Sequence, residues 1–306
     1  MRTEIELPRI SIITPSYNQG SFIEETILSV LNQKYSNLEY FVIDGGSTDN
    51  TVEIIKKYES QITYWISEKD KGQTHAINKG LAKATGDIIA YINSDDYYLP
   101  GSFHLVAEEF LKRPNADIIH GICRYVNERG DKIGQQLASI TRFDEIIDLW
   151  GVWWKGRNFV QPEVFWTKKA FANIGYFNEK LYYVMDYEYW LRILKNTGEV
   201  ATINQELTCF RRTETQKSNH SKKVADELLD VVYPYYCERG GIDNPKRKAL
   251  KGNCNYQKYF LTKIEESEKS GDHSFSRWLK LLVVLSTHPG ILYSPLFKNK
   301  IGAYFN

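Results

Sequence analysis

Two adjacent carboxylates carry the strongest chemical signal in this sequence. Asp95 and Asp96 follow the apolar run Ile88 to Ile92 in the segment Asn93-Ser94-Asp95-Asp96. Neighbouring carboxylates repel each other, so they are retained at low cost where a cation or hydrogen-bond donors neutralise them. Mg²⁺ and Mn²⁺ prefer oxygen ligands and commonly combine one or two carboxylates with substrate phosphates. The pair therefore predicts a divalent-cation site, and capping of the next helix is the alternative role.

Three further side chains suit a nucleotide or a proton transfer. Asp44 precedes Gly45 and Gly46, and its carboxylate can accept hydrogen bonds from a ribose hydroxyl or a base N–H, or close a simple Asp-Gly turn. Tyr17 can stack on a base or be an ordinary half-buried tyrosine. Asp186 opens an amphipathic segment, where it is either a helix N-cap or a general base.

The elements that position these residues alternate between strand and helix. Apolar runs predict four strands in the first hundred residues, at 10–14, 38–43, 62–66 and 88–92, and residues at helical spacing lie between them. This alternation predicts an α/β fold with a mostly parallel, twisted sheet flanked by helices. Ligands bind outside the carboxyl ends of such strands, so the loops 15–18, 44–47, 67–72 and 93–96 should border one site.

The second half of the sequence is less regular. Residues 118–126 and 132–137 predict a hairpin, 143–149 a short helix, and the chain beyond about Asn219 is helical and basic. We therefore expect a nucleotide-sugar-binding half at 1–121, an acceptor-binding and catalytic-base half of the same domain at 122–218, and a helical C-terminal extension at 219–306.

Composition excludes several other classes. The chain has 306 residues, 42% hydrophobic and 25% charged, with a net charge of +1, which is typical of a globular protein and does not point to nucleic acid. Neither a G-x-G-x-x-G fingerprint, a phosphate loop nor a G-x-S-x-G elbow is present. The four cysteines have no C-x-x-C spacing, and no secretory leader or apolar run of ~18 residues occurs, which predicts a cytoplasmic location.

Taken together, five segments resemble the family 2 glycosyltransferases of the GT-A fold. They are Ser11 to Asn18, Val42 to Thr51, Ser67 to Gly72 with Ala76 to Gly80, Asn93 to Asp96, and Met185 to Arg192. The resemblance covers roughly Pro8 to Arg212. It implies a metal-dependent, inverting enzyme that moves one sugar from a nucleotide-diphosphate sugar, with UDP as the expected carrier, to a hydroxyl of a glycan or lipid-linked acceptor. Bacterial surface-polysaccharide biosynthesis is the implied setting.

The resemblance also implies a role for individual residues. Pro15 and Tyr17 would border the base, Asp44 and Asp70 would bind base or ribose, and Asn78 would belong to the donor-binding segment. Asp95 would lie at the ribose and the metal, Asp96 would coordinate Mn²⁺ or Mg²⁺, and Asp186 would be the catalytic base. Asn93 departs from the family because many relatives carry there the first Asp of a D-x-D. Met185 replaces a Glu that often precedes the catalytic Asp.

The acceptor side is expected after Gly121. Gln161 lies in a segment that resembles the acceptor-side loop, and Trp154 and Trp190 are further candidates for acceptor contacts. Trp154, with Trp153, can stack on a sugar or serve as core or lid packing. Arg211 and Arg212 can contact the diphosphate or be ordinary surface arginines.

The tail from Arg277 to Phe297 is apolar with basic flanks. It can lie on the inner face of the plasma membrane beside a lipid-linked acceptor, or it can be a packing helix that closes the domain. Two other functions stay open from the residues alone: a sugar-1-phosphate nucleotidyltransferase, and a catalytically inactive nucleotide-sugar-binding protein.

Overall fold

A computed structural model of the protein describes residues 6–196, 199–214, 216, 221–238, 245–269 and 274–305. The chain divides into two compact units, Met1–Asn219 and His220–Asn306. The first unit contains the sheet and every residue that the sequence places in the site. The second unit is helical.

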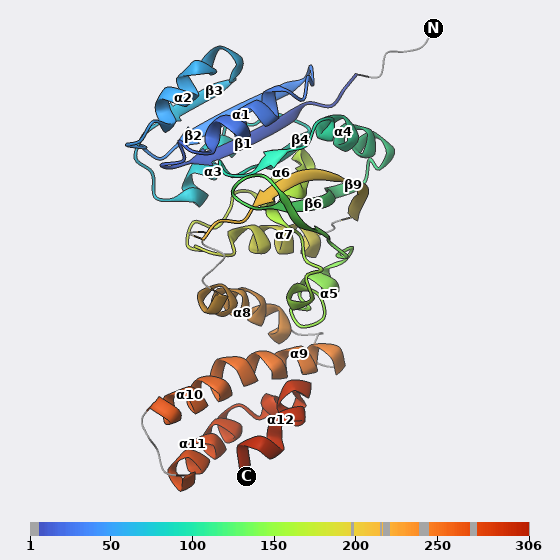
Figure 1. The fold of residues 1–306 in the computed structure, drawn as a ribbon. Coiled ribbons are helices and arrows are strands. Elements are labelled where there is room, and N and C mark those ends of the chain that lie inside the picture. The colour runs from blue at the N-terminus through green and yellow to red at the C-terminus, as the bar shows by residue number, and fades with distance from the viewer. Residues whose placement is uncertain are drawn as a thin grey trace. The chain divides into compact units, whose positions relative to one another are not determined.

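A nine-stranded sheet forms the centre of the first unit (Figure 1). Its strand order is β3-β2-β1-β4-β8-β6-β9-β5, with β7 paired to β6. The strands are β1 Ile10–Ser16, β2 Leu38–Asp44, β3 Tyr64–Ser67, β4 Ile88–Tyr91, β5 Tyr97–Tyr98, β6 Ala116–Val126, β7 Lys132–Leu137, β8 Val164–Thr167 and β9 Glu199–Arg211.

The sheet is parallel in its first half and mixed in its second half. Strands β3, β2, β1 and β4 pair in parallel, whereas β8 pairs antiparallel with both β4 and β6. β9 returns parallel to β6, and the short β5 pairs antiparallel with β9. The α/β class with a flanked sheet is therefore confirmed, and the sheet is mixed beyond β4. The hairpin of β6 and β7 is confirmed as well.

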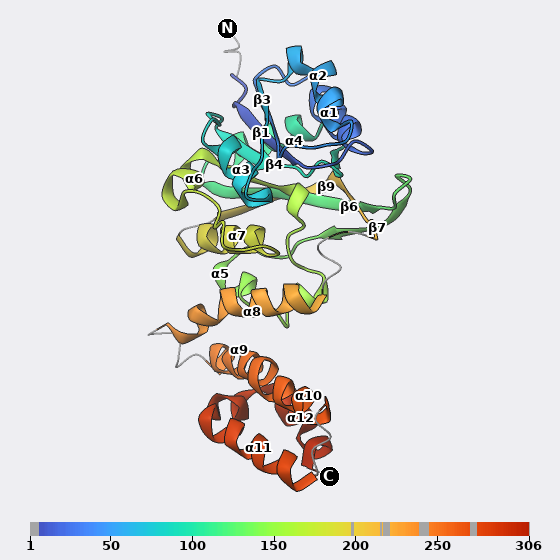
Figure 2. The ribbon, with the colours of Figure 1, turned by 90° about the vertical axis from the view of Figure 1, so that its left-hand side faces the viewer.

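Helices cover both faces of the sheet (Figures 1 and 2). α4 packs on β6 and β9, and α1 lies beside β5 and α2. α3 packs on β1 and β2 while α6 packs on β6 and β8. These helices are α1 Ile23–Leu31, α2 Thr51–Lys57, α3 Gln73–Leu81, α4 Ser102–Lys112, α5 Phe143–Ile146, α6 Lys168–Ile174 and α7 Met185–Asn196, with 3₁₀ turns at Glu59–Gln61, Trp153–Lys155 and Gln161–Glu163.

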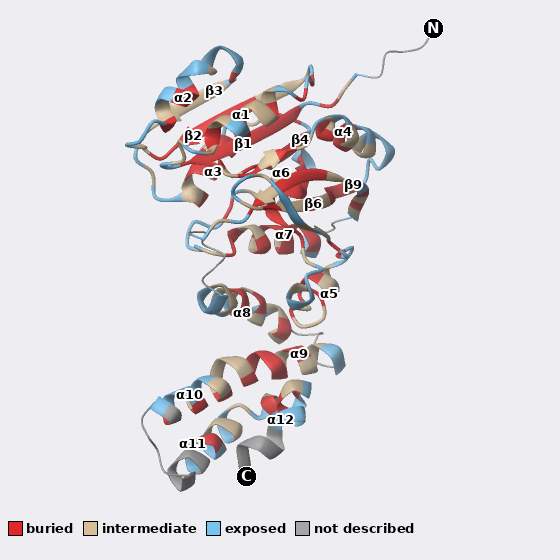
Figure 3. Cartoon of the chain, viewed as in Figure 1, coloured by how far each residue is buried: buried red, intermediate tan, exposed pale blue. Residues whose placement is uncertain are grey.

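Continuous apolar sequence explains the buried centre. All seven residues of β1 and all four of β4 are buried, as expected for strands covered by helices on both faces (Figure 3). Gly80 on α3 lies so close to β1 that an added Cβ would be 2.6 Å from Ile13 Cγ2. This close packing fixes the first turn of α3, and the loop before it, against the carboxyl ends of the strands.

The second unit consists of helices and helical turns. They are α8 Ser221–Cys237, α9 Pro245–Asn255, a π-helical turn Tyr256–Leu261, α10 Thr262–Lys269, α11 Ser274–Thr287, a 3₁₀ turn Pro289–Tyr293 and α12 Pro295–Phe305. Its core contains Tyr256, Phe260, Ile264, Leu281, Ile291 and Phe297. Within the described ranges, none of the helices has both the length and the apolar character needed to cross a membrane.

Candidate active site

The carboxyl ends of four neighbouring strands bring the predicted loops to one edge of the sheet. In the strand register, Ser16 of β1 lies beside Asp44 of β2, and Asp44 lies beside Ser67 of β3. On the other side of β1, Ile13 lies beside Tyr91, the last residue of β4. The loops that follow β1, β2, β3 and β4 therefore begin next to one another, as the parallel pattern predicts.

Asp44 is buried, and the chain itself supplies its partners. Its Oδ2 accepts hydrogen bonds from the backbone N–H groups of Gly46 (3.1 Å) and Ser47 (2.8 Å) and from Ser67 Oγ (2.6 Å). Its Oδ1 accepts from Ser47 Oγ (2.5 Å). The carboxylate therefore shapes its own loop and ties it to β3. Gly46 has φ +84°, a conformation that glycine adopts without strain.

Asp70 lies against the Asp44 loop. An added Cβ on Gly45 would be 2.8 Å from Asp70 Oδ2, so a side chain at Gly45 would displace the carboxylate. Asp70 Oδ1 accepts a hydrogen bond from Gly72 N at 2.7 Å, and this bond closes the turn before α3. The structure thus brings Asp44 and Asp70, the two expected base or ribose ligands, side by side, with a glycine between them.

The turn after β4 holds Asp95 and Asp96. Asp96 is 1% exposed, and its Oδ1 accepts a hydrogen bond from the backbone N–H of Arg211 at 2.9 Å. Its Oδ2 is buried and has no hydrogen-bond partner in the described part of the chain. Burial, followed by the neighbouring charge of Asp95, raises the pKa of Asp96 well above its usual range. Burial also raises the pKa of Asp95, which is the less buried of the two.

Arg211, at the end of β9, fastens this turn to its surroundings. Its guanidinium donates to the carbonyl oxygens of Asp95 (3.0 Å) and Glu128 (2.8 Å) and forms an ion pair with Glu25 on α1. The side chain is 2% exposed, so Arg211 is committed to holding the loop. Arg212 is exposed, and its guanidinium carbon lies 4.5 Å from the centre of the Tyr125 ring.

Asp186 reaches the same edge from the start of α7. Its Oδ1 accepts a hydrogen bond from the backbone N–H of Tyr187 at 2.7 Å. After burial, the charges of Asp186 and Asp96 are the two influences that raise the pKa of the buried Tyr91. Since such influence falls off with distance, both carboxylates lie close to the end of β4, although they are far apart in the sequence.

The remaining predicted residues take different places. Pro15 is buried at the end of β1, while Tyr17 is 60% exposed on the loop beyond it. Asn78 bonds to both backbone groups of Phe177 (3.0 Å each) and to Glu179 Oε1 (3.1 Å), so it joins α3 to the segment before α7.

Two tryptophans were expected at the acceptor. Trp154 is 39% exposed, with its ring centre 5.0 Å from that of Trp150. Trp190 is 1% exposed and packs edge-on against Phe159 in the core. A ring enclosed in this way presents no face to an acceptor, so Trp190 is corrected to a core residue.

Gln161 is 7% exposed and bonds to two groups at the end of β4. Its Nε2 donates to the Tyr91 carbonyl (2.7 Å), and its Oε1 accepts from Asn93 Nδ2 (3.1 Å). Sequence reasoning missed Gln73, which donates to Asn93 Oδ1 at 2.6 Å, and Ser67, which bonds to Asp44. Both lie in or just after the loop that follows β3, and that position was the available signal.

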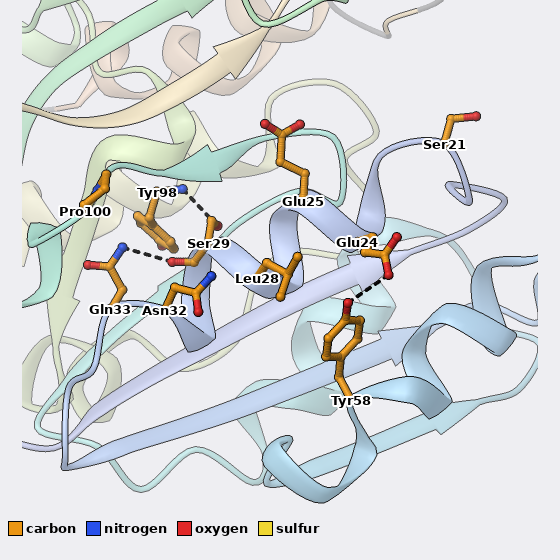
Figure 4. Close-up of a pocket in the computed structure, with 10 residues that line it drawn as sticks. All are labelled: Ser21, Glu24, Glu25, Leu28, Ser29, Asn32, Gln33, Tyr58, Tyr98 and Pro100. Carbon is orange, nitrogen blue, oxygen red and sulfur yellow. Dashed lines mark hydrogen bonds between the residues drawn. The ribbon is translucent and has the colours of Figure 1, made fainter.

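A separate cavity of about 610 Å³ lies along α1 (Figure 4). The Tyr58 hydroxyl donates to Glu24 at 2.8 Å on one side of it, and Tyr98 N donates to Ser29 Oγ at 3.1 Å on the other. Its lining consists of Ser21, Glu24, Glu25, Leu28, Ser29, Asn32, Gln33, Tyr58, Tyr98 and Pro100. None of the predicted site residues lines this cavity.

The turn after β4 fits a hard divalent cation. A buried carboxylate oxygen without a hydrogen-bond donor, beside a second carboxylate, is a ligand set that suits Mg²⁺ or Mn²⁺. Across the described residues, no group of three or more His, Cys, Asp or Glu side chains could hold a metal ion. Further ligands would therefore have to be water or oxygen atoms of the substrate.

A helix-flanked α/β sheet with acidic loops gathered at one edge defines a glycosyltransferase of the GT-A type. The family model for Glycosyl transferase family 2 matches residues 11–178, and the chain belongs to that family. Among solved structures, S. aureus TarS 1-349 in complex with UDP-GlcNAc aligns with a TM-score of 0.62 at 16% identity, covering 94% of this chain and 82% of that one. Mannosyltransferase PcManGT from Pyrobaculum calidifontis aligns with a TM-score of 0.55 at 15% identity, covering 98% and 85%.

Curated relatives are similar over most of this chain. The chondroitin synthase of Pasteurella multocida (strain Pm70) is 29% identical over 266 residues, which cover 82% of this chain and 26% of the relative. The chondroitin synthase of Escherichia coli is 27% identical over 270 residues, which cover 85% and 37%. The chain therefore spans between a quarter and two fifths of the length of these relatives.

Proposed function

We propose that this chain transfers one sugar from a nucleoside-diphosphate sugar to a hydroxyl of a glycan or lipid-linked acceptor, with a divalent cation and with inversion at the anomeric carbon. UDP is the proposed nucleotide, and bacterial surface-polysaccharide assembly is the proposed setting. The observation that carries the proposal is the convergence of Asp186 and Asp96 at the end of β4. A single displacement needs both a proton acceptor and a means of stabilising the leaving group.

The residues divide this work between them. Asp95 and Asp96 would hold Mn²⁺ or Mg²⁺, which when bound stabilises the negative charge on the departing diphosphate. Asp186 accepts the proton of the attacking acceptor hydroxyl. The Asp44 loop and Asp70 bind the base or ribose, and Tyr17, exposed beyond β1, covers the base.

The donor can be found by direct screening. The names of similar structures include UDP, UDP-GlcNAc and GDP-Man with Mn²⁺, which supports a panel of UDP-hexoses, UDP-N-acetylhexosamines and GDP-Man. A ligand that binds the native state raises its melting temperature, so thermal shift with Mn²⁺, Mg²⁺ or EDTA should select the donor. Transfer or slow donor hydrolysis is then measured. Release of pyrophosphate from a sugar 1-phosphate and a nucleoside triphosphate would instead identify a nucleotidyltransferase.

Asp186→Asn tests the assigned base. We expect transfer to fall by roughly 10²–10⁴-fold, because the amide cannot accept the proton, while the affinity for the nucleotide with Mn²⁺ stays within about twofold. Asp87→Asn is the matched control, because Asp87 is exposed at the opposite end of β4, where it accepts a bond from Arg9 N. Equal activity of Asp186→Asn and Asp87→Asn would remove Asp186 from the mechanism.

Trp154 remains our proposed acceptor contact, since more than a third of its surface is exposed and an aromatic face suits a sugar ring. Gln161 was also expected there, but both of its polar atoms bond to groups at the end of β4. Its role is considered separately below.

We also propose that the helical unit rests on an anionic membrane surface. Leu279 and Val283 are each 56% exposed on α11, and they border an apolar hollow of about 440 Å³ that is also lined by Lys258, Lys263, Lys280 and a single acid, Glu266. Apolar side chains with basic neighbours favour anionic lipid. Full-length chain should float with phosphatidylglycerol vesicles and not with phosphatidylcholine vesicles. Leu279→Glu with Val283→Glu should abolish flotation, whereas Ile133→Glu, which changes an equally exposed residue of β7, should not.

A further inference from the structure

Asn93 links three loops of the proposed site through its side-chain amide. Its Oδ1 accepts a hydrogen bond from Gln73 Nε2 at 2.6 Å, and its Nδ2 donates to Gln161 Oε1 at 3.1 Å. Gln73 opens α3 directly after the Asp70 loop, and Gln161 opens the 3₁₀ turn Gln161–Glu163. Asn93 O also accepts from Asp96 N at 3.1 Å, which closes the turn that carries the carboxylates.

The orientation of the Gln161 amide is fixed from its other end. Its Nε2 donates to the carbonyl oxygen of Tyr91 at 2.7 Å, so its Oε1 must face Asn93. If the amide were reversed, an oxygen would face the Tyr91 carbonyl inside the protein, at the cost of an unpaired buried group. The partner of Gln161 at position 93 must therefore be a hydrogen-bond donor.

We propose that Gln161 is a positioning residue for the donor side of the site, and that position 93 must be an amide because it accepts from Gln73 and donates to Gln161. An ionised aspartate at this position has no proton to donate. It would place an oxygen against Gln161 Oε1 and add a third negative charge beside Asp95 and Asp96. This inference rests on the proposed function only where it concerns the donor, because the pairing itself belongs to the folded chain.

The decisive experiment combines two substitutions. Asn93→Asp should weaken binding of UDP with Mn²⁺, measured by calorimetry, by about five- to tenfold, the effect of roughly one mismatched hydrogen bond. Gln161→Ala alone should weaken it about fivefold, and it should raise the KM for donor more than the KM for acceptor. In the Asn93→Asp background, however, Gln161→Ala removes the opposing oxygen, so the double variant should bind better than Asn93→Asp alone.

The opposite signs overturn the proposal. Asn93→Asp binding UDP with Mn²⁺ as tightly as the parent chain, or the double variant binding more weakly than Asn93→Asp, would show that the amide pair does not position the site. A rise confined to the acceptor KM in Gln161→Ala would make Gln161 an acceptor contact instead.

Unfolding free energies of the same four chains, measured in urea without ligand, test the pairing independently of any donor. There too Gln161→Ala should destabilise the parent and stabilise Asn93→Asp. If the parent bound no nucleotide at all, the proposed function would fail while this cycle still decided the pairing. Gln73→Ala, which leaves Gln161 intact, provides a milder variant and should weaken UDP binding by about two- to fivefold.

Discussion

Asp44 and Asp96 are both buried at the carboxyl ends of strands in the same sheet, yet their environments differ. Asp44 accepts four hydrogen bonds from three residues of the loops after β2 and β3. Asp96 accepts one, from Arg211 N, and its other oxygen has no partner among the described residues. The chain satisfies the first carboxylate and leaves the second one incomplete.

This difference separates the two jobs that a buried carboxylate can do. A carboxylate with several donors stays ionised and organises the backbone, as Asp44 does for the Gly45-Gly46 loop. A carboxylate buried beside a second one, without donors, costs free energy that a bound cation can offset. We therefore expect substitution of Asp44 to affect mainly stability and substitution of Asp96 to affect mainly function.

Asp96→Asn should produce the largest effect. The amide removes one of two neighbouring charges, so we expect transfer to fall about 10²–10³-fold while the free energy of unfolding rises or changes by less than about 1 kcal/mol. Transfer rates and urea unfolding check the two parts. In thermal shift, Mn²⁺ should raise the melting temperature of the parent chain and leave that of Asp96→Asn unchanged. A strongly destabilised but active Asp96→Asn protein would reverse the comparison.

Asp44→Asn should have the opposite profile. Its carboxylate accepts from both Ser47 N and Ser67 Oγ, and an amide cannot accept at both oxygen positions. We expect the free energy of unfolding to fall by about 2–3 kcal/mol, measured in urea, because at least one buried donor loses a charged acceptor. Mn²⁺ should still raise the melting temperature. Loss of that Mn²⁺ response with unchanged stability would place Asp44 with Asp96 instead.

The sequence sufficed where local pattern determines structure. Unbroken apolar runs located β1, β2 and β4 to within two residues, and the parallel order then brought Asp44, Asp70 and Asp96 to one edge of the sheet. β5 escaped notice because a strand of two residues, Tyr97–Tyr98, carries no periodicity. β8, Val164–Thr167, is four residues long and follows directly after the 3₁₀ turn that contains Pro162.

Long-range partners were the part that local pattern could not supply. Asn78 belongs to a segment that resembles a donor-binding motif, but its hydrogen bonds go to Phe177 and Glu179, about a hundred residues away. Arg211 was a candidate diphosphate contact, and only the pairing of β9 with β5 and β6 reveals that it holds the Asp95–Asp96 turn. Such roles depend on which elements meet, and periodicity is silent about that.

Glu163 offers the finest test of what an incomplete carboxylate means. It is fully buried, its Oε1 accepts from Val160 N at 3.0 Å, and its Oε2 has no partner among the described residues. Burial raises the pKa of Glu163 well above its usual range. Above the unfolded pKa of about 4.3, the folded chain therefore binds more protons than the unfolded chain, and the free energy of unfolding should fall as pH rises.

Glu163→Gln removes this titration while keeping the shape of the side chain. The difference in unfolding free energy between Glu163→Gln and the parent, measured in urea from pH 5 to pH 8, should grow in favour of the variant by at most about 1.4 kcal/mol per pH unit. His120, whose Nδ1 lies 3.9 Å from Glu163 Oε1, has a pKa lowered by burial to about 4, so it stays neutral over this range in both chains. Mn²⁺ should leave the difference unchanged, because Glu163 has no second carboxylate beside it. A difference that is flat with pH would mean that Glu163 is ionised when folded, and a difference that Mn²⁺ abolishes would mean that an unpartnered oxygen alone attracts the cation.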